Sequence, residues 1–215
     1  LQLLERMFRR EKVDPAEAAD TIDTAKKEVE RLDAIINQFL KALRPVKLYF
    51  KTTDLKDVLT ESLNFMRHEI ENRSVEVKCL WGNDIPPVQA DEGQLKQAFY
   101  NIIKNAIQSM PHGGTLNIAC GRNDEGETVI EFSDTGKGIS PEDMPRIFNA
   151  YYTTKATGNG LGLMIVERII RQHGARLSIE SVKGKGTRFI VVFPVMESRV
   201  RVLGPANNYA GILPP

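Results

Sequence analysis

Two asparagines that lie one helical turn apart are the first candidates for a binding site in this sequence. Asn101 and Asn105 lie in a segment whose apolar residues repeat at helical spacing. At about 100° per residue, the two side chains share one flank of that helix, about 120° from its buried stripe. Two carboxamide oxygens placed there suit a hydrated Mg²⁺ ion whose other ligands are phosphate oxygens. Taken alone, the pair would be more typical of solvated surface asparagines.

An aspartate at a glycine-rich turn is the second candidate. Asp134 follows an apolar strand pattern and precedes Gly136 and Gly138. Glycines at the end of a strand let a ligand approach the backbone closely. A carboxylate there can accept a hydrogen bond from the exocyclic amine of adenine, which would distinguish ATP from GTP. The alternative is an ordinary turn built from turn-forming residues.

The third segment suits phosphate. Residues 158–162 are Gly-Asn-Gly-Leu-Gly and lead directly into an apolar helix. Exposed backbone N–H groups and the positive end of a helix favour an anion at such a place. Glycine-rich turns are common, so the prediction of a nucleotide site depends on the order and spacing of all three segments.

Together the three segments resemble the catalytic ATP-binding domain of sensor histidine kinases, and more broadly the ATPase superfamily shared with gyrase B, Hsp90 and MutL. Residues 91–110 match the N box of that family, residues 134–138 the G1 box and residues 158–162 the G2 box. Residues 147–155 look like the F box, whose aromatic side chains pack the root of a lid. The resemblance covers residues 54–195.

The resemblance implies ATP (or ADP) and Mg²⁺ as cofactors, and it assigns roles to the motif residues. Asn101 and Lys155 are expected to act in catalysis, and Asn105 with Asn101 to hold the metal. Thr187 belongs to a Gly-Thr pair on the strand beneath the base. Contacts with the nucleotide are expected from Asn105, Asp134, Gly136, Gly138, Ile139, Phe148, Tyr151, Thr154, Lys155, Gly158, Asn159, Gly160, Leu161, Gly162, Leu163 and Thr187.

The implied reaction moves the γ-phosphoryl group of ATP to a histidine on dimerisation helices, and then to an aspartate of a response-regulator receiver domain. In the family that histidine lies several turns before the position of Leu1, so we expect a fragment that cannot phosphorylate itself. None of the three histidines replaces it: His68 is expected on a helix surface, His112 in a turn, and His173 at a helix end, where the dipole favours an imidazolium.

Two alternatives remain open. ATPases of the gyrase, Hsp90 or MutL type place an acidic residue where Asn101 stands, and an amide cannot serve as that base, so hydrolysis is disfavoured. A nucleotide-binding dimerisation module without catalysis is the other alternative. It stays open because Gln108 occupies a position that is basic in many relatives, although Lys155 can supply that charge.

The pattern of elements around these motifs predicts an α+β fold, a two-layer α/β sandwich. We expect helices at residues 54–72, 91–110 and 161–173, and hairpin strands at residues 75–80, 115–120, 128–133, 176–181 and 188–193. Asp91 and Gln94 form a capping-box pattern. The buried stripe of that helix should be Leu95, Phe99, Ile102, Ala106 and Met110. Residues 137–160 are irregular and rich in glycine, which favours a lid with one short capped helix at Ser140.

The N-terminal part has a different pattern. Residues 1–44 are expected to form a helical hairpin that dimerises as a four-helix bundle, because a heptad seam cannot be buried by two helices alone. The alternative is packing on the chain's own globular domain. Residues 45–53 are then a linker, residues 54–196 the ATP-binding domain and residues 197–215 a tail. The seam consists of Ile22, Ala25, Val29, Leu32, Ile36, Phe39 and Leu43.

Composition limits the partners. The net charge is +1 and no basic block stands out, so nucleic acid is not expected as a partner. The two cysteines lack metal-ligand spacing and indicate a reducing, cytoplasmic compartment. No apolar run reaches membrane-spanning length, so a membrane would be reached only through segments outside this chain.

Overall fold

The computed structural model describes residues 19–29, 47–155 and 158–195. Residues 19–29 form a helix on which the seam positions Ile22 and Val29 are 60% and 64% exposed in the single chain. The other predicted seam positions beyond Val29, and the predicted tail, lie outside the described residues. Within the described part, no helix is long and apolar enough to cross a membrane.

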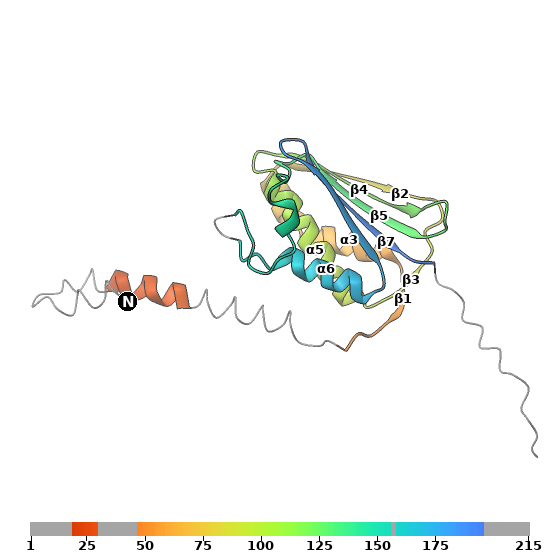
Figure 1. Cartoon of the computed structure of the whole chain (residues 1–215), viewed down its shortest axis with the longest axis horizontal. Helices are drawn as coiled ribbons and strands as arrows, with labels where there is room; N and C mark the ends of the chain where they lie inside the picture. Colours follow the sequence, from red (N-terminus) through yellow and green to blue (C-terminus); the bar gives the residue numbers. More distant parts are fainter. Residues whose placement is uncertain (1–18, 30–46, 156–157, 196–215) are drawn as a thin grey trace, which may run out of the picture.

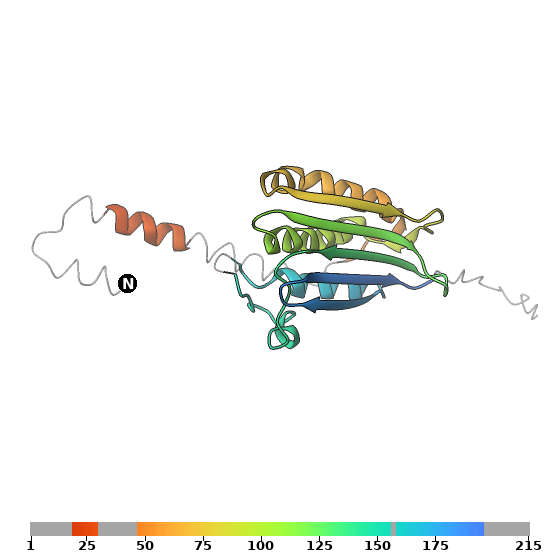
Figure 2. The same cartoon turned by 90° about the horizontal axis from the view of Figure 1, so that it is seen from above.

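A five-stranded sheet with helices on one face forms the main body (Figure 1). Its strand order is β2-β4-β5-β7-β6, and Figure 2 shows the strands side by side from β2 at one edge to β6 at the other. The predicted two-layer α/β arrangement is therefore confirmed. The strands are β2 (Val75–Trp81), β4 (Gly114–Arg122), β5 (Thr128–Asp134), β6 (Arg176–Val182) and β7 (Gly186–Phe193).

One strand pairing differs from the expected antiparallel hairpins. Strands β2 and β4 run parallel, whereas β4–β5, β5–β7 and β6–β7 are antiparallel. Parallel neighbours need a crossover connection. That connection is the helix α5 (Glu92–Ser109), which packs between α3 (Leu55–Phe65) and α6 (Gly162–Gln172) on the covered face of the sheet.

Helix α5 carries the Asn pair and forms as predicted. Asp91 Oδ1 accepts a hydrogen bond from the Gln94 backbone N–H at 3.1 Å, which caps the helix. Its predicted stripe is buried, and the ring centroids of Phe99 and Phe132 lie 5.6 Å apart in the core. The buried stripe fixes the rotation of α5, and thereby sets Asn101 and Asn105 on a half-exposed flank.

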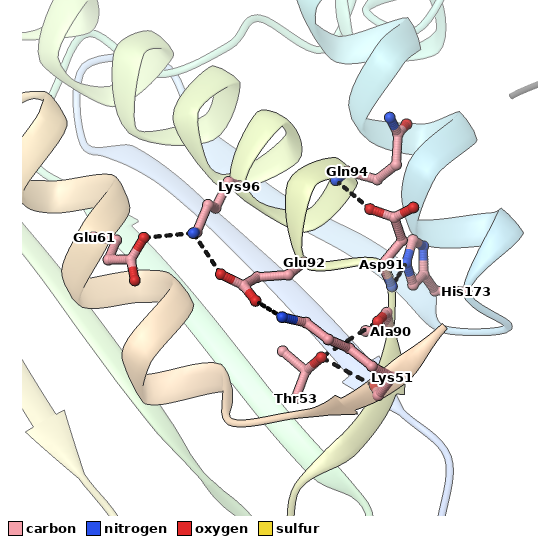
Figure 3. Close-up of polar contacts among 9 residues, drawn as sticks. All are labelled: Lys51, Thr53, Glu61, Ala90, Asp91, Glu92, Gln94, Lys96 and His173. Atoms are coloured by element: carbon pink, nitrogen blue, oxygen red, sulfur yellow. Dashed lines mark hydrogen bonds and ion pairs between the residues drawn. The ribbon is translucent and has the colours of Figure 1, made fainter. Parts of the chain in front are cut away.

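The second half of the predicted capping box does not form. The Asp91 backbone N–H donates instead to His173 Nε2 at 3.0 Å (Figure 3), and the buried Gln94 Oε1 has no hydrogen-bond partner among the described residues. His173 Nδ1 lies 2.7 Å from the Ile169 carbonyl oxygen, so it must carry the ring hydrogen. The expected imidazolium at this helix end is therefore wrong: in this geometry His173 is a buried neutral ring.

The predicted linker is partly structured. Its last residues form β1 (Lys51–Thr53), which pairs with β3 (Val88–Ala90) in a two-stranded sheet. The Tyr49 backbone N–H donates to Asp91 Oδ2 at 3.0 Å, and the Phe50 ring lies 5.2 Å from that of His173. Lys51 pairs with Glu92, which also binds Lys96 (Figure 3). The segment is thus attached to the start of α5 and the end of α6.

Two further elements differ from expectation. The helix predicted over residues 54–72 is interrupted at Met66 between α3 and α4 (Arg67–Asn72). Met66 is buried, whereas Phe65 is 78% exposed and meets the Tyr100 ring edge-on. The short helix expected at Ser140 is a 3-10 turn, η1 (Met144–Arg146), preceded by a hydrogen bond from the Asp143 N–H to Ser140 Oγ.

Candidate active site

A cavity of about 570 Å³ lies between α5, the segment that follows β5, and the start of α6. This volume is in the range of small-ligand sites. Most of the predicted site residues line it: Asn101, Asn105, Asp134, Gly138, Ile139, Thr154, Lys155, Gly158, Asn159, Gly160, Gly162, Leu163 and Thr187. Gly136, Phe148, Tyr151 and Leu161 are not among the lining residues.

Asp134 lies at the end of β5 and is only 6% exposed. Its Oδ1 accepts hydrogen bonds from the Gly136 N–H at 2.8 Å and from Ser109 Oγ at 3.0 Å. Burial raises the pKa of this carboxyl, and the hydrogen bonds from Gly136 and Ser109 act in the opposite direction. Asp134 is therefore a hydrogen-bond acceptor that lines the cavity and is oriented by Gly136 and Ser109.

The Asn pair faces the first residue of α6 across the cavity. A Cβ added at Gly162 would lie 3.4 Å from Asn101 Oδ1 and 4.0 Å from Asn105 Nδ2. Asn101 Nδ2 donates to the Gln97 carbonyl oxygen at 3.0 Å, which turns its own oxygen toward Gly162. Glycine at residue 162 therefore lets the start of α6 come close to Asn101 Oδ1 and Asn105 Nδ2, and the positive end of a helix favours an anion.

Lys155 closes this part of the site. Its Nζ donates to Asn105 Oδ1 at 2.8 Å and to Gln108 Oε1 at 2.7 Å. Burial lowers the pKa of this ammonium to about 8, and Lys137, Lys104 and Arg73 act in the same direction. Lys155 thus connects the lid predicted over residues 137–160 directly to α5.

Two adjacent tyrosines have different places at the root of the lid. Tyr151 is 51% exposed with a φ of 65°, an unusual value for a bulky residue, and its N–H donates to the Gly160 carbonyl oxygen at 3.1 Å. Tyr152 lines the cavity, donates its hydroxyl to Asp143, and packs its ring 4.3 Å from the Arg146 guanidinium. The tyrosine beside the predicted one therefore contacts the cavity.

The lining residues absent from the predicted set include Tyr100, Lys104, Gln108, Ser109 and Tyr152. Lys104, Gln108 and Ser109 lie three or four positions from Asn101 or Asn105 on α5, so helical spacing from the Asn pair would have found these three. The histidines do not join the site: His68 and His112 are exposed and outside the lining, and His173 is buried at the far end of α6.

The donor set fits a nucleotide with its metal. In the described residues there is no group of three or more His, Cys, Asp or Glu side chains arranged to hold a metal ion. A cation here would depend on amide oxygens together with phosphate oxygens, and Mg²⁺ prefers oxygen ligands. The cavity supplies the amide side chains of Asn101 and Asn105, the start of α6 at Gly162, and several lysines.

This fold and site define an ATP-binding domain. Residues 90–197 match the family described as histidine kinase-, DNA gyrase B- and HSP90-like ATPase, and the chain belongs to that family. Within the family, its relatives are sensor histidine kinases. The sensor histidine kinase ZraS of Salmonella typhimurium is 34% identical over 170 residues, which cover 79% of this chain and 37% of ZraS. The chain thus spans well under half the length of this curated relative.

Solved histidine kinases share the fold. Full-length ShkA in complex with AMPPNP aligns with a TM-score of 0.69 at 24% identity, covering 85% of this chain and 40% of ShkA. ThkA in complex with the response regulator protein TrrA aligns with a TM-score of 0.67 at 24% identity, covering 90% of this chain and 55% of ThkA. These two likenesses concern the fold, whereas the family is shown by residues 90–197 and by ZraS.

Proposed function

We propose that this chain is the kinase core of a two-component sensor histidine kinase, which binds ATP with Mg²⁺ and transfers the γ-phosphoryl group to a histidine. One observation carries the proposal: a buried carboxylate, two amide oxygens and the start of a glycine-led helix surround a single cavity. The phosphoryl group on that histidine would then be transferred to an aspartate of a receiver domain. ThkA, whose fold is shared, is described in complex with a response regulator.

Each residue would contribute position or charge, which are the main needs of phosphoryl transfer. Bound ATP·Mg²⁺ would supply the phosphoryl group and the metal charge. Asp134 would accept a hydrogen bond from the adenine amine, and Asn101 and Asn105 would hold the metal through their amide oxygens. The first N–H groups of α6 would bind phosphate oxygens, and Lys155 would neutralise phosphate charge from the lid.

The dimerisation helices remain part of the proposal. Residues 1–44 would pair with a second copy, and residues 45–53 would link them to the domain at 54–196. Residues 1–44 contain no histidine, so the acceptor would be a histidine that this sequence does not contain. ATP and receiver domains are cytoplasmic, so we place this core in the cytoplasm. A hydrolase is disfavoured because position 101 is an amide. A non-catalytic module is disfavoured because Lys155 supplies the charge that Gln108 lacks.

Calorimetry with ATP and GTP, each with and without Mg²⁺, tests the proposal. We expect Mg²⁺-dependent binding of ATP and much weaker binding of GTP. Asp134→Asn should cost about 1.5–3 kcal/mol of ATP binding, the range for a charge-assisted hydrogen bond. Asp124→Asn, at an exposed hairpin loop, is the matched control and should bind normally. Equal affinities for ATP and GTP would refute the role of Asp134.

A further inference from the structure

The contact between Lys155 and α5 joins residues far apart in the sequence. Asn105 and Gln108 are three positions apart on α5, so their side chains lie on one flank, and both amide oxygens accept hydrogen bonds from Lys155 Nζ. Lys155 is half-buried here. Burial removes water from the Lys155 ammonium, and the two groups that accept its hydrogen bonds are uncharged amides rather than carboxylates.

Other cations surround this ammonium. Lys137, Lys104 and Arg73 all act against the charge of Lys155, and Asp134 is the group that favours it. Lys104 and Lys137 also line the cavity. A desolvated lysine held by neutral amides among other cations would gain much from a polyanion, because a charge-assisted hydrogen bond is about twice as strong as a neutral one.

One of the two acceptors also has another expected use. Asn105 Oδ1 is the oxygen that the proposed function assigns to Mg²⁺, and Lys155 occupies it in this structure. Metal binding at Asn105 would require Lys155 to release that oxygen, whereas nothing requires it to release Gln108. Gln108 therefore stays available as an anchor for the lysine.

We propose that Gln108 is a positioning residue: it holds Lys155 of the lid beside the phosphate end of the cavity, both before nucleotide binds and after Asn105 has passed from Lys155 to the metal. This rests on the proposed function and adds how the negative charge of the phosphates is neutralised. The neutralising cation is Lys155 of the lid, and the neutral amide of Gln108 holds it on α5. Gln108 itself contacts Lys155 and acts on the phosphates only through it.

A double-mutant cycle measured by calorimetry tests this assignment. Gln108→Ala should weaken the binding of ATP·Mg²⁺ about tenfold, whereas adenosine, which has no phosphate, should bind with unchanged affinity. In a Lys155→Met background, Gln108→Ala should have no further effect, because it acts through that lysine. Gln172→Ala, an exposed glutamine at the end of α6, is the control and should bind ATP normally.

A charge relocation completes the test. Gln108→Lys in the Lys155→Met background places an ammonium on the same flank of α5 and should recover most of the lost ATP·Mg²⁺ affinity. Failure to recover it, or additive losses in the cycle, would overturn the role of Gln108. If the unmutated chain does not bind ATP·Mg²⁺ at all, the proposed function fails instead, so the two failures are distinguishable.

Discussion

A methyl group at residue 162 should separate folding from nucleotide binding. Gly162 is the first residue of α6, and its backbone does not require a positive φ. An added Cβ would meet Asn101 Oδ1 at 3.4 Å, an ordinary van der Waals contact, so Gly162→Ala is compatible with the fold. Because alanine favours helix more than glycine by up to about 1 kcal/mol, the free energy of unfolding should stay the same or rise slightly.

Binding should change in the opposite direction. The methyl group would cover the start of α6, where we place the phosphates, and would contact Asn101 of the Asn pair. Loss of one charge-assisted hydrogen bond costs about 1.5–3 kcal/mol, so the ATP·Mg²⁺ affinity should fall about ten- to hundredfold. Thermal unfolding and calorimetry on the same samples measure both quantities.

Gly138→Ala is the contrasting variant. Gly138 has a φ of 64°, and its Cβ would lie 2.2 Å from the Val182 carbonyl oxygen. That substitution should lower the free energy of unfolding, since both the backbone conformation and the close contact oppose a side chain. If Gly162→Ala binds ATP·Mg²⁺ as tightly as the unmutated chain, the space beside the Asn pair does not hold the phosphates.

Three further outcomes are expected. Val29→Glu should convert a dimer into a monomer that still binds ATP; a monomeric unmutated chain in light scattering would contradict the heptad interpretation. Incubated with γ-labelled ATP, the chain should take up no acid-labile label, whereas a longer chain that adds an acceptor helix should; label on His68 would contradict this. Lys51 and Lys96 lower the pKa of Glu92 from 4.5 to about 2. These ion pairs should therefore add about 1 kcal/mol or less to the free energy of unfolding above pH 4.5, and this contribution should disappear as the pH falls toward 2. Glu92→Gln should flatten that part of the curve of stability against pH.

Periodicity and turn chemistry predicted the scaffold of the site well. The stripe from Leu95 to Met110 fixed the rotation of α5, and the strand pattern before Asp134 placed that carboxylate at the end of β5. Both depend on neighbours close in sequence, which a single chain displays directly. The same holds for the end of α6, where Gly174 has a φ of 68°.

Contacts between distant segments could not be predicted in the same way. Lys155 meets Gln108 across 47 positions, and no local pattern encodes that distance. The pairing of β1 with β3 involves three residues on each side, too few for an alternation to be visible. Tyr151 and Tyr152 are neighbours in an irregular segment, so no repeat could show which ring contacts the cavity. His173 accepts a hydrogen bond from the Asp91 backbone N–H because α6 ends beside Asp91, a contact between residues 82 positions apart.

The position of Asp91 has a mechanical consequence. Its carboxylate holds the chain at Tyr49 and the first turn of α5, while its backbone N–H holds the end of α6 through His173. Gly162 lies at the opposite end of α6, and the Asn pair lies in the middle and second half of α5. A displacement of the chain at Tyr49 would therefore reach the start of α5 and the end of α6 together. Both helices line the cavity, so its two walls would be shifted as a pair.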